Sequence, residues 1–105
     1  KASKYHLSFH LHHLNLPLYM EEHAPFISLL KQAYQTTTGK EANLYATGGG
    51  TYARTVQGRC VAFGPLFEDE PNRNMHDANE HIDIKRFMKH REICLQAMYD
   101  MIMEP

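Results

Sequence analysis

The chain lacks a net charge of either sign and lacks any long apolar run. Its 105 residues include 11 Lys and Arg against 12 Asp and Glu, which gives a net charge of −1. Because this balance creates no field that attracts polyanions, we expect neither nucleic acid nor an anionic membrane surface as a partner. No apolar stretch approaches the roughly 20 residues that a membrane-spanning helix needs, so we expect no helix of this chain to cross a membrane.

An initiator Met is also absent, and cysteine is scarce. Residues 1–5 contain no apolar core of a signal peptide, so we expect a fragment or processed chain that functions in the cytoplasm. Cys60 and Cys94 both lie in apolar settings. A disulfide between them is one interpretation, but we favour buried free thiols in a reducing compartment.

Two segments carry the signals of amphipathic helices. The first begins near Pro25, which suits a first helical turn, and Gly39 is placed to end it as a C′ glycine. Its apolar stripe comprises Ile27, Leu30, Ala33 and Tyr34. The second begins after Asp83, a good N-cap residue. We expect its buried stripe to comprise Ile84, Phe87, Met88, Arg91, Cys94, Leu95, Met98 and Ile102.

Three other segments are expected to be strands. Tyr5 to Leu14 alternate apolar and polar residues, which is the period of a half-buried strand. Leu44 to Thr47 and Cys60 to Phe63 read as shorter strands, the latter stopped by Gly64-Pro65, and residues 68–79 read as a loop. The order strand, helix, strand, strand, helix predicts an α/β fold with too few strands for a complete sheet.

A run of three glycines, Gly48 to Gly50, follows the expected strand at Leu44. Glycine can adopt φ > 0 and lets backbone N–H groups approach a ligand closely. No Lys-Ser/Thr follows at P-loop spacing and no G-x-G-x-x-G is present, so a phosphate site is a weak interpretation. Taken alone, the run predicts a tight turn.

Histidine is over-represented, with eight residues. Four of them, His6, His10, His12 and His13, lie in the first expected strand, where His10 and His12 would point to the same side and could chelate a metal. We favour a solvated polar face, because no Cys or carboxylate joins them at ligand spacing. His81 and His90 are expected to be surface residues.

Three blocks in order carry a family resemblance: Gly48 to Arg54, Val61 to Phe67, and His76 to Glu80. Together they resemble the C-terminal end of the dinuclear zinc dipeptidases, the Xaa-His dipeptidase (carnosinase-like) branch of the aminoacylase/carboxypeptidase superfamily. The resemblance covers nearly the whole chain and implies a piece of a larger enzyme. Residues 1–19 would be the terminal strand of an α+β lid domain, and residues 20–105 the C-terminal portion of an α/β/α catalytic domain.

The resemblance also implies a reaction and its site. The parent would hydrolyse dipeptides with a free N-terminus, of Xaa-His or β-Ala-His type, with two zinc ions. His76 would be the last zinc ligand and Glu80 its outer-shell partner. Gly49, Gly50 and Thr51 would offer backbone N–H groups to the substrate, at its C-terminal carboxylate.

For Arg54, in contrast, we favour a surface ion pair. No catalytic residue maps to this chain, because the general base and the remaining ligands would lie elsewhere in the parent. We therefore expect the chain alone to be inactive. Its partners would be the dipeptide substrate and the remainder of the parent enzyme, and the isolated chain would self-associate through unpaired strand edges.

Two rival hypotheses remain open. One is a stand-alone module that binds a small anion at the glycine run. The other is a His-rich metal-binding module without catalysis, using the four N-terminal histidines.

Overall fold

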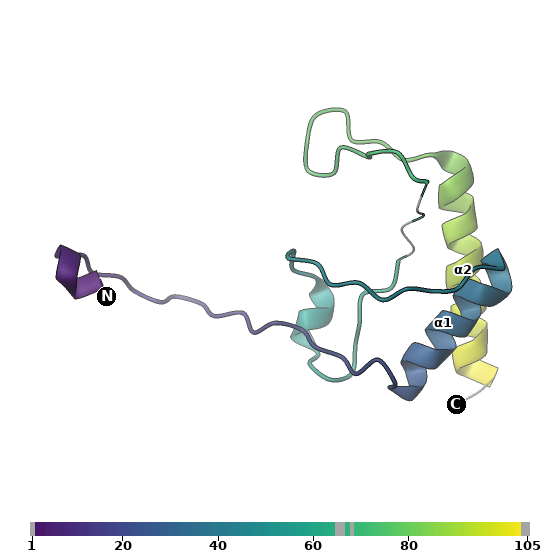
Figure 1. The fold of residues 1–105 in the computed structure, drawn as a ribbon, viewed down its shortest axis with the longest axis horizontal. Coiled ribbons are helices and arrows are strands. Elements are labelled where there is room, and N and C mark those ends of the chain that lie inside the picture. Colours follow the sequence, from purple (N-terminus) through teal and green to yellow (C-terminus); the bar gives the residue numbers. More distant parts are fainter. Residues whose placement is uncertain (1, 65–66, 68, 104–105) are drawn as a thin grey trace.

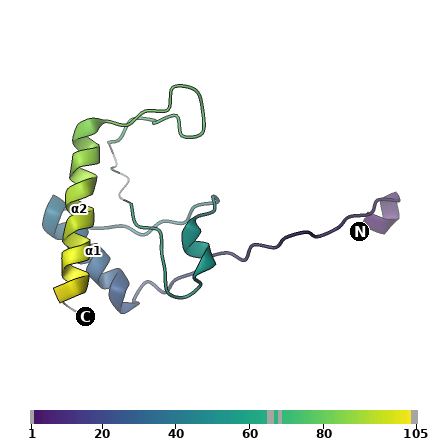
Figure 2. The same cartoon turned by 180° about the vertical axis from the view of Figure 1, so that it is seen from behind.

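The computed structural model describes residues 2–64, 67 and 69–103. In this part of the chain, two α-helices, α1 (Pro25–Thr38) and α2 (Ile84–Met103), pack against each other, and two short 3₁₀ helices, η1 (Ala2–Tyr5) and η2 (Tyr52–Thr55), lie apart from them. Figure 1 shows the helix pair at one end of the molecule and a long N-terminal arm at the other. Figure 2, from behind, shows the chain between α1 and α2 projecting to one side of the helix pair.

Helix α1 has the ends that the sequence predicts. Pro25 occupies the first turn, where its missing N–H costs no hydrogen bond. Gly39 takes the left-handed conformation (φ 70°) and donates its N–H to the carbonyl oxygen of Gln35 at 2.8 Å. The hydroxyls of Thr37 and Thr38 donate to the carbonyl oxygens of Ala33 and Tyr34, one turn back, which gives both part-buried hydroxyls a partner.

Helix α2 also begins where predicted. The Asp83 carboxylate accepts a hydrogen bond from the N–H of Arg86 at 2.9 Å, as an N-cap residue should. The Asp83 carbonyl oxygen accepts the first helical hydrogen bond, from the N–H of Phe87 at 2.9 Å.

The core lies between the two helices. Ile27, Leu30 and Ala33 of α1 pack with Ala97 of α2, and both alanines are almost wholly buried. Small side chains at this crossing let the two backbones approach closely. Val61 and Phe63, from the extended segment between the helices, pack against the same cluster and so attach that segment to the pair.

The buried face of α2 differs from the predicted one. Ile93 and Ala97 are buried, with 0% and 4% of their surface exposed. Ile84 and Ile102, from the predicted stripe, are each 73% exposed. Each lies nine residues from Ile93, about two and a half turns, and hence on the opposite side of the helix. The prediction was wrong because α2 is apolar on two faces, and periodicity alone does not say which one meets α1.

The three expected strands are not formed in the described residues, so the α/β arrangement is not seen there. Residues 7–17 form an extended arm in which both faces are exposed, including Leu7, Phe9 and Leu11 at 65–77% exposure. Residues 44–47 and 60–63 are likewise extended without a ladder. The physical reason is that a strand needs a hydrogen-bonded neighbour, and no segment among the residues that the structure describes pairs with these. Pro65 and Glu68, at the expected strand end and loop start, lie outside the described residues.

The chain does not enclose its own apolar surface. Its radius of gyration is 18.3 Å, whereas a compact domain of this length has about 13 Å. Its accessible surface is 9185 Å², against roughly 6,100 Å² for a compact protein of this mass. In the described residues, no helix is long and apolar enough to cross a membrane.

Candidate functional site

The glycine run lies in an exposed loop that uses ordinary backbone angles. None of Gly48, Gly49 and Gly50 has a positive φ; among the described glycines only Gly39 and Gly58 do. The freedom to adopt φ > 0, which the sequence offers here, is therefore not used. Of the three glycines, only Gly50 lies so close to a neighbouring group that an added Cβ would disturb it.

Two backbone donors of this loop are available to a ligand. The N–H of Gly49 is directed to the hydroxyl oxygen of Thr47 at 3.3 Å. The N–H groups of Gly50 and Thr51 make no hydrogen bond within the described part of the chain. Of the three predicted substrate-binding residues, Gly50 and Thr51 thus have unused donors, whereas the donor of Gly49 is engaged.

A short 3₁₀ turn, which the sequence did not predict, returns Arg54 to Gly50. The carbonyl oxygen of Thr51 accepts a hydrogen bond from the N–H of Arg54 at 3.2 Å, at the start of η2. A Cβ placed on Gly50 would lie 3.1 Å from Nη2, 3.2 Å from Cζ and 3.3 Å from Nη1 of Arg54. The guanidinium therefore lies directly against Gly50, in space that any larger residue would fill.

The surface ion pair expected for Arg54 is not formed. Arg54 is half-buried, yet it makes no salt bridge with any residue that the structure describes. Sequence reasoning missed its role because the contact depends on a 3₁₀ turn. The spacing of four residues from Gly50 was the only signal that could have indicated it. The loop thus combines two unused N–H donors with one unpaired cation, a chemistry suited to an anion.

His76 lies at the outer end of a closed polar loop. Arg73 and His81 close this loop, since the carbonyl oxygen of Arg73 accepts from the N–H of His81 at 3.0 Å. Inside it, the carbonyl oxygen of Asn74 accepts from the N–H of Asp77 at 3.0 Å. His76 is exposed and has φ 65°, a conformation uncommon for non-glycine residues and often found at functional positions.

The imidazole of His76 makes no hydrogen bond within the described residues, and Glu80 does not contact it there. Both side chains are exposed in the same loop. The assignment of Glu80 as the outer-shell partner of His76 therefore stays a prediction. The neighbouring His81 is exposed as expected, whereas His90 is half-buried in α2.

Two charged pairs hold the base of the His76 loop. Arg73 donates to the mostly buried carboxylate of Glu70 from the same turn. Arg86 on α2 pairs with the carboxylate of Asp69 at 2.8 Å, and this hydrogen bond holds the pKa of Asp69 below its ordinary value of 3.8. The loop is thus attached to the first turn of α2.

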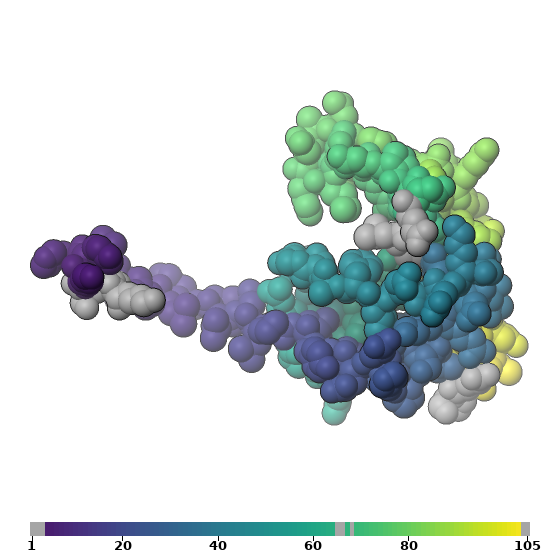
Figure 3. Space-filling view, in the orientation of Figure 1, coloured from purple at the N-terminus to yellow at the C-terminus, as the bar shows by residue number. Residues whose placement is uncertain are grey.

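Figure 3 shows the glycine-loop segment and the His76 loop as separate lobes with an open cleft between them. Among the described residues, no three His, Cys, Asp or Glu side chains lie close enough to share a metal ion. The described residues therefore do not assemble a metal centre around His76. The same holds for the N-terminal arm, where the rings of His10 and His12 are 6.4 Å apart without a third ligand.

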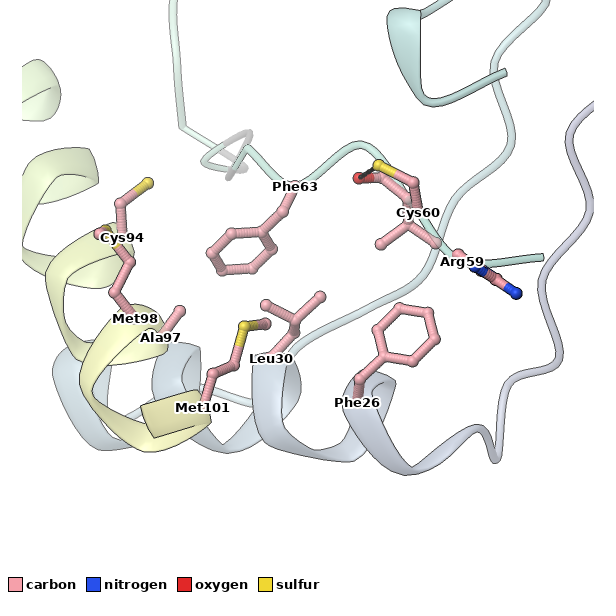
Figure 4. Close-up of a pocket in the computed structure, with 10 residues that line it drawn as sticks. Phe26, Leu30, Arg59, Cys60, Phe63, Cys94, Ala97, Met98 and Met101 are labelled. Atoms are coloured by element: carbon pink, nitrogen blue, oxygen red, sulfur yellow. Dashed lines mark hydrogen bonds between the residues drawn. The ribbon is translucent and has the colours of Figure 1, made fainter. Parts of the chain in front are cut away.

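A separate apolar cavity of about 330 Å³ lies beside the helix pair. Figure 4 shows Phe26 of α1 below Arg59 and Cys60, and Leu30 of α1 next to Phe63 and to Met101 of α2. Its two cysteines, Cys60 and Cys94, are half-buried free thiols, as expected, and burial raises the pKa of Cys94 above its ordinary value of 9.0. The cavity contains no His or carboxylate, so it lacks the groups for hydrolysis.

Comparison with known proteins shows which proteins this chain is similar to. The chain is 40% identical over 88 residues to a Staphylococcus saprophyticus protein, 39% identical to one from Staphylococcus haemolyticus and 38% identical to one from Staphylococcus aureus strain USA300. Each of these relatives is named "Putative dipeptidase".

Each match covers 84% of this chain but only 18% of the relative, so the chain spans less than a fifth of the length of these relatives. No solved structure matches the chain. The model of peptidase family M20/M25/M40 matches residues 4–102. This match includes both the glycine run and the His76 loop, and the chain therefore belongs to peptidase family M20/M25/M40.

Proposed function

We propose that this chain is the C-terminal portion of a zinc-dependent dipeptidase that hydrolyses dipeptides with a free N-terminus, of Xaa-His or β-Ala-His type. Membership of the peptidase family is the observation that carries this proposal. Residues 1–19 belong to the last strand of a lid domain and residues 20–105 to an α/β/α catalytic domain. Two exposed apolar surfaces support this division: the N-terminal arm, and the uncovered face of α2 formed by Ile84, Leu95 and Ile102. Each needs a covering layer that the rest of the parent would supply.

In this proposal His76 supplies one ligand of a dinuclear zinc centre. The imidazole of His76 is exposed and makes no hydrogen bond within the described residues, which leaves its nitrogens available to a metal. Zinc would supply polarisation of the scissile carbonyl and a water activated at neutral pH. Glu80 would hold the second ring nitrogen of His76 once the loop is enclosed by the parent.

The glycine loop binds the substrate in this proposal. Gly50 and Thr51 each have an N–H donor without an acceptor in the described part of the chain, which supports hydrogen bonds to a carboxylate of the dipeptide. Gly49 lines the same loop, with its own N–H held by Thr47. The two free thiols favour a reducing compartment, and we assign the parent to the cytoplasm on that ground.

The full-length parent provides the test. We expect the purified protein to hydrolyse β-Ala-His or Xaa-His dipeptides, to lose this activity on chelation, and to regain it with Zn²⁺. The chain alone is expected to be inactive in the same assay. A parent that holds zinc yet cleaves no dipeptide would contradict the proposal. Zinc binding or small-anion binding by the isolated chain, with an inactive parent, would support the rival modules instead.

A further inference from the structure

The ring of His90, on α2, lies against the backbone of Gly64, upstream of the His76 loop. A Cβ placed on Gly64 would lie 3.7 Å from Cε1 and 3.9 Å from Nε2 of His90. These are ordinary van der Waals distances, so the imidazole covers the open side of this glycine. His90 is half-buried there. A side chain of α2 thus packs directly on the backbone of the chain that leads to His76.

A second side chain of α2 contacts the same segment five residues further along. Arg86 pairs with the carboxylate of Asp69 at 2.8 Å. Because Arg86 and His90 are four residues apart, they lie one turn apart on the same face of α2. The chain is therefore held to that face at two points, residues 64 and 69. A single attachment would let the chain beyond it pivot, whereas two attachments fix its direction.

Further contacts connect Asp69 to His76. Glu70, the next residue, pairs with Arg73. The carbonyl oxygen of Arg73 accepts from the N–H of His81 at 3.0 Å, which closes the loop around His76. His76 itself has φ 65°, a conformation that persists only where the surrounding structure holds it. A shift of the loop base on α2 should therefore move the His76 imidazole as well.

We propose that His90 is a positioning residue for His76: together with Arg86, it fixes the direction in which the chain runs from the helix pair to the His76 loop. Phe63, just before Gly64, packs against the helix core and anchors the segment at one residue. The packing of His90 on Gly64 sets the course of the chain beyond that anchor. This proposal rests on the role of His76 as a zinc ligand, which belongs to the function proposed above.

The test is the zinc affinity of the full-length parent, measured by competition with a chromogenic chelator. In His90→Ala we expect the dissociation constant for zinc to rise roughly 2- to 30-fold, the range for substitutions that act on a site through intervening contacts. The metal-free protein should remain folded at the assay temperature, as its melting curve shows. His90→Phe keeps a flat ring at this position and should restore the wild-type affinity. Arg91→Ala, at the next and exposed position of α2, is the matched control and should change neither quantity.

An unchanged zinc affinity in His90→Ala would show that Phe63 and Arg86 suffice, and the proposal would be wrong. It would also be wrong if His90→Phe did not restore the affinity, or if the affinity fell only because the metal-free protein had unfolded. A parent that binds no zinc, or that keeps its zinc affinity in His76→Ala, would instead contradict the ligand role of His76 and with it the proposed function.

Discussion

Arg86 donates from one nitrogen, Nη2, to two oxygens of Asp69: the carboxylate at 2.8 Å and the backbone carbonyl at 2.9 Å. This double contact joins the base of the His76 loop to the first turn of α2. It crosses 17 residues of sequence, and in the described residues no other side-chain hydrogen bond or salt bridge spans as many. Among the polar side-chain contacts, this one guanidinium therefore attaches the base of the loop to α2.

We predict that Arg86→Gln loosens the His76 loop, whereas Lys85→Gln, which removes a charge from the same helical turn, does not. Lys85 forms no salt bridge within the described residues, so it is a matched control. Hydrogen exchange of residues 69–81 in the full-length parent measures the difference. Equal protection in both variants would show that other contacts hold the loop.

The same pair predicts a pH dependence. Because the pKa of Asp69 is lowered in the folded protein, its contribution to loop order is fully present above its ordinary value of 3.8. The contribution is lost as pH falls through the lowered folded pKa. Exchange of the loop, corrected for intrinsic rate, should therefore increase below pH 3.8 in the wild type. Asp69→Asn should already show fast exchange at neutral pH.

For His76→Ala in the full-length parent, we predict lower zinc content and a fall in kcat/KM. Removal of a residue that only supports a metal ligand typically costs about 10- to 100-fold, so removal of the ligand itself should cost at least as much. The fold should persist, because the side chain of His76 is exposed. A His10→Ala/His12→Ala double variant is the control and should keep both metal and activity. If that control loses zinc instead, the N-terminal arm is the metal site.

We predict that Gly50→Ala lowers kcat/KM about tenfold while Gly48→Ala does not. The added Cβ displaces the guanidinium of Arg54 in the first variant and meets nothing in the second. Gly48→Ala should also be neutral or stabilise by up to about 1 kcal/mol, since residue 48 has no positive φ. Melting curves and kinetics on the same samples separate the two effects. Equal kinetic losses in both variants would contradict the contact.

The chain on its own should self-associate, and we predict that Leu95→Glu weakens this association. Leu95 is 67% exposed on the uncovered face of α2, where apolar surface favours a second copy when the parent is missing. Sedimentation of the isolated chain measures it. Gln57→Glu, which adds the same charge at an exposed loop residue, should have little effect. A monodisperse, cooperatively melting wild-type monomer would contradict the view of this chain as a fragment.

The two α-helices could be predicted from the sequence because their signals are local. Pro25, Gly39 and Asp83 act through hydrogen bonds or steric limits within one turn of their own positions. The buried face of α2 could not be predicted, because Ile93 and Ile84 differ in their partner and not in their hydrophobicity. The expected strands are not formed in the described residues for a related reason: alternation prepares a segment for pairing, but a ladder needs a second segment.

The candidate site shows the same division. His76 and the glycine run could be identified from their order along the sequence and their resemblance to a family. The contact of Arg54 with Gly50 could not, because it depends on a turn at Thr51 that no strong local signal marks. The outer-shell role of Glu80 stays a prediction, because Glu80 makes no hydrogen bond to the ring of His76 in the described residues.

Residues 39–83, which include both the glycine run and His76, form a single connection between α1 and α2. Its two ends are held at a fixed separation by the packing of Ala33 and Ala97. The entropic cost of bringing the two ends of this connection together depends only weakly on its length. The packing of the two helices against each other is what compensates for that cost. A substitution that opens the helix crossing would therefore release both loops at once. Substrate affinity and metal affinity would then fall in parallel, although neither ligand touches the substituted residue.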